Sequence, residues 1–401
     1  MSRVVSVLVI LFGLFSAHLA VSAQDQQLGA RTKSMGGSYT AFEDDPVSIW
    51  LNPAGIATQP DQFAVCYQTY TAYPVERSRG EYENVLTSVS PETVIADPAI
   101  VPSYLGAVFQ LGDPENPMSV GICYARPYHL NYALDRVEDP EQETFSPEDN
   151  VEQSLIRFRA AFAYDFRFTS FGEESSSWFS HLSLGVGLDV GYERWDFTSQ
   201  NLSDESNSST GFGFGLGFLL GVFDNQDDVR VNIGIAYQSA VKYQFNIDPD
   251  LLPAFDMPQQ LNFGITGYLL EGTPLRLTFD FQWIEWSETA ELPVYPGQPT
   301  FQDAFNFSIG MEYRVSISEN LSIYPRLGFR LFDAPWGDKD DLPMTGSYKL
   351  ILDTGGEVFP IATFGVGISW VTEDGEVRTL DVAADAGGDS VNVAVGYGME
   401  F

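Results

Sequence analysis

The stretch Leu28–Ala57 reads LGARTKSMGGSYTAFEDDPVSIWLNPAGIA, and it follows neither the period of a helix nor that of a strand. Its turn-forming residues are Gly29, Gly36, Gly37, Pro46, Pro53 and Gly55, which surround the acidic pair Asp44-Asp45. Glycine permits backbone conformations that other residues avoid, and proline fixes φ. The stretch therefore predicts a compact, irregular plug rather than a regular element.

The residues before this stretch predict a secretory signal peptide over 1–23. Arg3 supplies a positive start, Val4–Leu14 is almost wholly apolar, and Val21-Ser22-Ala23 offers small residues for cleavage. The alternative is an uncleaved membrane anchor. No later segment approaches the roughly 20 apolar residues of a transmembrane helix. We therefore expect an exported mature chain that begins near Gln24.

The chain after Asp61 alternates in hydrophobicity with a period of two. At the C-terminus, Val393, Val395 and Tyr397 share one face of an expected strand, and Asn392 and Ala394 share the other. In a soluble sandwich the polar face meets water, whereas in a membrane barrel the apolar face meets lipid. Alternation alone leaves both architectures open.

The lengths of the connections favour the membrane barrel. The expected strands are 61–72, 102–112, 117–128, 153–170, 179–197, 209–223, 229–243, 259–270, 274–286, 303–315, 320–333, 358–371, 377–387 and 389–401. Short and long connections alternate between them, as in outer-membrane barrels. We predict an all-β fold: a transmembrane antiparallel barrel of about 14 strands over 61–401, with an N-terminal hatch, 24–60, that plugs its lumen.

The last strand carries a pattern that fits this class of barrel. Outer-membrane barrels usually end in an aromatic residue preceded by alternate apolar positions, which the barrel-insertion machinery reads. Tyr397, Met399 and Phe401 match that pattern. A strand that ends in phenylalanine by chance is the alternative.

Several motifs resemble those of the FadL/TodX-type family of outer-membrane transport proteins. Met35-Gly36-Gly37 and Asn52-Pro53-Ala54-Gly55 match the family's hatch motifs. Later matches are Asp280–Ser287, Gly310–Tyr313 and Arg326–Arg330, and the resemblance is weak between about Tyr73 and Phe255. It implies passive uptake of hydrophobic compounds, such as long-chain fatty acids or aromatic hydrocarbons, across a Gram-negative outer membrane. It also implies that Asn52, Pro53, Ala54, Gly55, Gly36 and Gly37 shape the hatch or gate.

The sequence gives little support for catalysis, so we expect no enzyme and no cofactor. There is no Gly-x-Ser-x-Gly elbow and no His/Cys cluster with zinc spacing. His129 falls in a loop expected over 129–152. Cys66 and Cys123 lie in expected strands, where two buried thiols are favoured over one bridge.

The expected lumen carries arginines that could contact a ligand's head group. Arg157 and Arg314 are the candidate partners of a carboxylate, because the guanidinium fork binds both oxygens. The favoured alternative pairs the inward arginines with inward acids in structural networks, because buried charge is costly unless it is paired. The inward acids are Asp165, Asp189, Asp280, Glu312 and Asp381.

The net charge of −35 excludes nucleic acid as a partner. Asp338, Asp340 and Asp341 form a weak candidate cation site, and acidic loops could bridge to lipopolysaccharide through divalent cations; a solvated acidic surface is the favoured alternative. An acidic mouth repels fatty-acid anions and so favours neutral hydrophobic substrates. We expect partners among such molecules, outer-membrane lipids and the insertion machinery. Alternative functions are a secretion-machinery barrel of the type IX shuttle kind and a structural or adhesive barrel.

Overall fold

The structure is a computed structural model that describes most of the chain after the expected signal peptide. The described residues are 27–70, 75–76, 91–96, 99–112, 117–139, 144–168, 179–198, 205–225, 229–243, 256–269, 274–288, 303–333, 358–387 and 390–401. The expected signal peptide, 1–23, and the candidate cation site at Asp338, Asp340 and Asp341 lie outside them. No helix among the described residues is long and apolar enough to cross a membrane.

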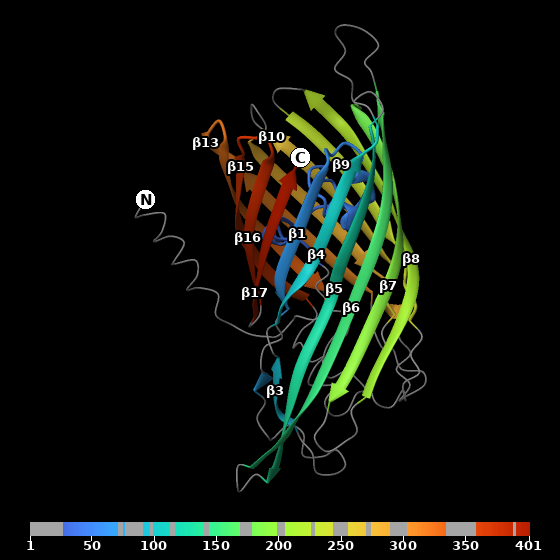
Figure 1. Ribbon diagram of the computed structural model, residues 1–401, viewed down its shortest axis with the longest axis vertical. Helices are drawn as coiled ribbons and strands as arrows, with labels where there is room; N and C mark the ends of the chain where they lie inside the picture. Colours follow the sequence, from blue (N-terminus) through green and yellow to red (C-terminus); the bar gives the residue numbers. More distant parts are fainter. Residues whose placement is uncertain are drawn as a thin grey trace.

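Fourteen antiparallel strands close into a barrel (Figure 1). They are β1 (Gln62–Tyr70), β4 (Ala99–Gln110), β5 (Met118–Asp139), β6 (Thr144–Arg167), β7 (His181–Thr198), β8 (Glu205–Asn225), β9 (Val229–Gln238), β10 (Gln260–Leu269), β11 (Leu275–Ile284), β12 (Ala304–Tyr313), β14 (Leu321–Asp333), β15 (Val358–Val371), β16 (Val377–Gly387) and β17 (Ser390–Glu400). The barrel closes where β1 pairs with β17, with Gln62 opposite Glu400. The expected barrel is confirmed.

Three further strands lie outside the expected set. β2 (Val75–Glu76) pairs with β3 (Pro91–Ala96), and β3 pairs with the part of β5 between Tyr132 and Arg136. β13 (Val315–Ser318) extends the hairpin between β12 and β14. A short 3-10 turn, η2 (Trp286–Glu288), follows β11.

The prediction of a loop over 129–152 is wrong, because β5 continues to Asp139 and β6 begins at Thr144. Irregular pairing near Ala125, Leu134 and Val137 shifts the phase of the alternation. Such bulges add a residue to one strand and hide its period of two. His129 is accordingly not an exposed loop residue: it lies in β5, is 5% exposed, and its Nδ1 lies 2.7 Å from Ser154 Oγ.

The apolar face of the strands points outward. Along β12 every second residue is buried, from Ala304 to Glu312, and the residues between them are exposed. Ile309 is 53% exposed, whereas Glu312 is 2% exposed. The same holds on other strands, where exposed large apolar residues include Ile122, Phe158, Leu188, Phe212 and Leu327. This distribution is that of a membrane barrel and not of a soluble sandwich.

Residues 27–60, which we call the luminal segment, lie inside the barrel near the end where Gln62 and Glu400 meet (Figure 1). We call this the turn end, and the opposite end of the strands the far end. The segment contains α2 (Ala30–Ser34), α3 (Ser48–Leu51) and η1 (Pro53–Ile56). α2 contacts β14–β17 and β1, and η1 contacts β5–β8. The segment therefore crosses the lumen from one wall to the other.

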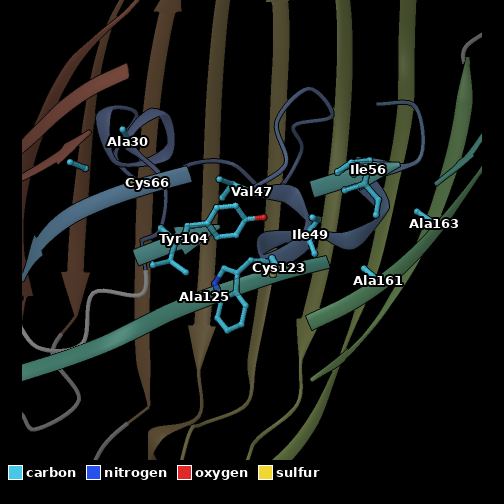
Figure 2. Close-up of a cluster of buried hydrophobic side chains, with 14 of the residues drawn as sticks. Ala30, Val47, Ile49, Ile56, Cys66, Tyr104, Cys123, Ala125, Ala161 and Ala163 are labelled. Atoms are coloured by element: carbon cyan, nitrogen blue, oxygen red, sulfur yellow. The ribbon is translucent and has the colours of Figure 1, made fainter. Parts of the chain in front are cut away.

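An apolar cluster joins the luminal segment to the wall (Figure 2). Val47, Ile49 and Ile56 of the segment pack with Tyr104 of β4 and Cys123 of β5. Small wall residues such as Ala125, Ala161 and Ala163 leave room for these side chains. The two cysteines, Cys66 and Cys123, are both buried and unbridged, as expected.

Candidate functional site

The Met35-Gly36-Gly37 motif docks against β12 and β14. Gly36 and Gly37 have φ values of 70° and 84°, in a backbone region that residues other than glycine rarely adopt. Gly36 N donates to Thr363 Oγ1 at 2.8 Å. A Cβ on Gly328 of β14 would lie 2.3 Å from Gly36 N, so the wall itself needs glycine at this contact.

The Asn52-Pro53-Ala54-Gly55 motif docks on the opposite wall. Asn52 caps η1, because its Oδ1 accepts from Ala54 N at 3.2 Å. Its Nδ2 donates to Thr40 O at 2.7 Å and to Phe218 O of β8 at 3.1 Å. A Cβ on Gly185 of β7 or on Gly217 of β8 would lie within 2.5 Å of Ala54 N. The motif is therefore fitted to the wall by hydrogen bonds and by close backbone approach.

A cluster of opposite charges joins the segment to the wall at the turn end. Arg31 of α2 holds Glu312 of β12 through two hydrogen bonds, of 3.0 and 2.9 Å, and also reaches Asp44 at 3.1 Å. Arg276 of β11 lies 2.5 Å from Asp44, and Arg326 of β14 lies 2.7 Å from Glu312. Burial alone would raise the pKa of Asp44, but Arg276 and Arg31 lower it below its usual value. The cluster is thus a charged clamp on the luminal segment.

Three further contacts between opposite charges hold the segment. Lys33 Nζ lies 2.5 Å from Asp385 Oδ2, and both side chains are almost fully buried. Glu43 lies 2.8 Å from Arg230 and 3.3 Å from His181 Nε2. Burial acts to raise the pKa of Glu43, but the neighbouring His181 and Arg230 bring it below its usual value.

A single carboxylate orients the turn after the Gly-Gly motif. Asp280 Oδ2 accepts from Tyr39 N and Thr40 N, each at 2.8 Å, and from Thr40 Oγ1 at 2.6 Å. Charged acceptors make hydrogen bonds roughly twice as strong as neutral ones. Asp280 therefore anchors this turn to β11.

Arg157, one candidate for a ligand's head group, has a structural partner. Its Nη2 lies 2.7 Å from Asp189, which also binds Arg159. Arg159 donates to Trp50 O at 2.7 Å, and both guanidinium groups lie about 5 Å from the centre of the Trp50 ring. The arrangement matches the alternative in which inward arginines pair with inward acids.

Arg314, the other candidate, is exposed between β12 and β13. It donates to Ser322 Oγ at 3.3 Å. Arg157 belongs to β6, whereas Arg314 follows β12, so these two arginines come from different parts of the barrel wall.

Two cavities lie against the luminal segment. One, of about 190 Å³, opens on the charged clamp at the turn end and is lined by Arg31, Asp44, Arg276, Arg326 and Asp381. The other, of about 50 Å³, lies between the segment and β10–β14 toward the far end. Trp50, Asn262, Asp280 and Gln282 are among the residues that line it.

Sequence reasoning missed the partners that the luminal segment itself supplies. Arg31 and Lys33 are two of only 20 basic residues in a chain with 55 acidic ones, and both enter buried ion pairs. The scarcity of basic residues is the only signal in the sequence that points to the roles of Arg31 and Lys33. Among the described residues, no cluster of three or more His, Cys, Asp or Glu residues is arranged to hold a metal ion.

The comparisons with known proteins rest on structure. No family model matches the chain, and no curated protein matches it. A FadL homologue from Pseudomonas aeruginosa matches with a TM-score of 0.55 at 12% identity, over 96% of this chain and 98% of that one.

Two transporters of toluene are similar to the same degree. The Pseudomonas putida toluene transporter TodX matches with a TM-score of 0.55 at 13% identity, over 95% of this chain and 100% of that one. The Ralstonia pickettii toluene transporter TbuX matches with a TM-score of 0.55 at 15% identity, over 94% and 99%. The chain therefore has the fold of the FadL/TodX-type transport proteins, as its motifs implied.

Proposed function

We propose that this protein is an outer-membrane channel for the passive uptake of hydrophobic compounds, with the luminal segment as its hatch. The turn end would face the periplasm and the far end the outside. The observation that carries the proposal is a barrel with an apolar outer face whose lumen is crossed by a segment held through side chains. Such a segment can shift without breaking the hydrogen bonds of the sheet.

The outer membrane is a barrier to hydrophobic compounds, and a plugged barrel would let them cross it. Hydrophobic compounds cross a lipopolysaccharide leaflet poorly and use water-filled pores poorly. A barrel closed to small hydrophilic solutes can bind such compounds and release them past the hatch. The proteins that share the fold include two toluene transporters, which supports hydrophobic cargo for this chain.

Uptake of N-phenyl-1-naphthylamine tests the proposal, because this uncharged probe fluoresces once it reaches lipid. Gram-negative cells that express the protein should take up the probe faster than cells with an empty vector, with no gain in leakage of a hydrophilic solute. Equal rates would reject the proposal. Mass spectrometry of small molecules released from the purified protein should recover an uncharged, lipid-like ligand.

Deletion of Asn52–Gly55 tests the gate role of that motif. The barrel should still fold, because these residues form no part of the sheet. Permeability should change, because the deletion removes the contacts to Thr40 and Phe218. A folded deletion protein with unchanged permeability in liposomes would reject the role.

A further inference from the structure

Several uncharged hydrogen-bonding side chains line the cavity of about 50 Å³. Three carboxamides on its wall are joined across β10, β11 and β12. Gln282 Nε2 donates to Gln260 Oε1 at 3.1 Å, and Asn306 Nδ2 donates to Gln282 Oε1 at 2.9 Å. We call Gln260, Gln282 and Asn306 the carboxamide row. The row satisfies its own members and presents a neutral polar surface.

Other polar atoms around this cavity have no hydrogen-bond partner. They are Thr32 Oγ1, Tyr39 Oη, Trp50 Nε1, Asn262 Oδ1 and Asp280 Oδ1, and each of these residues is at most 6% exposed. A buried polar group without a partner costs about 1–3 kcal/mol. Five such groups on the lining of one cavity indicate a site that is completed by a bound molecule.

Among the unpartnered atoms, Trp50 Nε1 only donates, Asn262 Oδ1 and Asp280 Oδ1 only accept, and the hydroxyls of Thr32 and Tyr39 can do either. A hydroxyl group suits them, because its oxygen accepts from the Trp50 N–H and its proton can go to Asn262 Oδ1 or Asp280 Oδ1. A carboxylate suits them poorly, since it would face two acceptors. Arg330 also lines the cavity, and its charge offsets that of Asp280. The lining therefore carries no net charge.

The size of the cavity limits what it can hold. A cavity needs roughly 10–15 Å³ to hold one water molecule on this measure, so about 50 Å³ takes a head group and its nearest carbons. Trp50, Leu51, Ile284 and Phe332 supply apolar surface beside the polar atoms. The rest of an elongated ligand would extend beyond the cavity.

We propose that this cavity is a binding subsite for the hydroxyl head group of an uncharged amphiphile, such as a fatty alcohol. That the transported substrate binds in this subsite rests on the proposed function. Binding of such an amphiphile depends on the cavity alone. It gives the channel a preference for oxygenated neutral compounds over plain hydrocarbons.

The test compares three probes with the same tail: n-octane, 1-octanol and octanoate. Retention of each radiolabelled probe is measured on full-length protein in nanodiscs, with retention by empty nanodiscs subtracted. The protein should bind 1-octanol about fivefold more tightly than n-octane, the value of one net hydrogen bond. Octanoate should bind more weakly than 1-octanol.

Asn262→Leu should remove most of the preference for the alcohol, and Trp50→Phe should reduce it while keeping an aromatic ring beside Arg157 and Arg159. Asn232→Leu is the matched control: Asn232 is fully buried on β9, lies outside the cavity lining, and neither of its amide atoms has a hydrogen-bond partner. It should keep the preference. Two independent variants keep the test valid if one fails to fold.

Equal retention of 1-octanol and n-octane, tighter binding of octanoate, or a preference that survives both variants would overturn the subsite. Each of those results leaves faster uptake of N-phenyl-1-naphthylamine intact. Loss of that uptake with the binding preference retained would instead overturn only the transport function.

Discussion

The inner wall formed by β10, β11, β12 and β14 differs sharply between its two ends. At the turn end Glu312 and Arg276 of the wall pair with Arg31 and Asp44 of the luminal segment, and Arg326 pairs with Glu312 beside them. Toward the far end the same strands carry the carboxamide row beside a small cavity. Charge therefore fixes the segment in place at the turn end, whereas neutral hydrogen-bonding groups face the far end.

Removal of the central acid of the clamp should have the largest effect. Glu312→Gln leaves Arg31, Arg276 and Arg326 without their shared partner, and breaking a buried ion pair costs about 3–5 kcal/mol. The segment should loosen, and liposomes that contain the variant should admit a small sugar that the native protein excludes. Swelling rates measure this.

The matched control is Glu376→Gln, which removes the partly exposed partner of Arg378 in a turn. It should leave swelling unchanged. A Glu312→Gln protein as impermeable to sugar as the native one would show that the charged clamp does not hold the segment.

A charge placed on the outer face of the same strand should come next in size. Ile309 is only three residues from Glu312 but is 53% exposed on the outside of the barrel. Arginine on the lipid face costs about 2–4 kcal/mol at the membrane midplane. Ile309→Arg should lower stability by that order in urea unfolding from lipid vesicles. Unchanged stability would argue against a lipid-facing position for Ile309.

Acid should weaken the charged attachments. The pKa values of Glu43 and Asp44 are lowered in the folded protein. Their stabilisation is therefore complete above the ordinary carboxyl pKa of roughly 4, and it is lost as the pH falls through the lowered values. Asp45 acts in the opposite sense, because burial raises its pKa.

Sugar permeation measured from pH 7 down to pH 3 should rise at the acid end. Glu43→Gln should make that rise shallower, because one of the titrating groups is gone. Permeation that stays low and flat down to pH 3 would contradict the role of these carboxylates.

The smallest effect on stability is expected in the carboxamide row. Gln282→Ala removes two hydrogen bonds that are partly exposed, each of net value about 1 kcal/mol. The luminal segment should stay in place and sugar should stay excluded, while the discrimination between 1-octanol and n-octane falls. A sugar leak as large as that of Glu312→Gln would erase the distinction between the two ends.

Much of the barrel could be predicted from the sequence, because strand alternation is a local pattern. The strands expected at 358–371 and 377–387 have the observed bounds. The prediction failed at 129–152, where bulges broke the period on which it depended. It also missed β2 and β3, which are short.

The attachments of the luminal segment could not be predicted, because their partners are far apart in the chain. Arg31 and Glu312 are separated by 281 positions, and Lys33 and Asp385 by 352. Alternation places Glu312 on the inner face but says nothing of which cation reaches it. For the same reason alternation places Arg157 on the inner face but does not give its pairing with Asp189.

On the proposed function, hydrophobic compounds pass the luminal segment only when this segment can move. Ser38 of the segment and Thr278 of β11 bring their hydroxyl oxygens within 3.1 Å, so Ser38→Cys with Thr278→Cys should form a tether by oxidation. Uptake of N-phenyl-1-naphthylamine by cells with the oxidised double variant should fall to that of empty-vector cells and return on reduction, while each single variant is unaffected. A fully cross-linked protein that takes up the probe as fast as its reduced form would contradict the account.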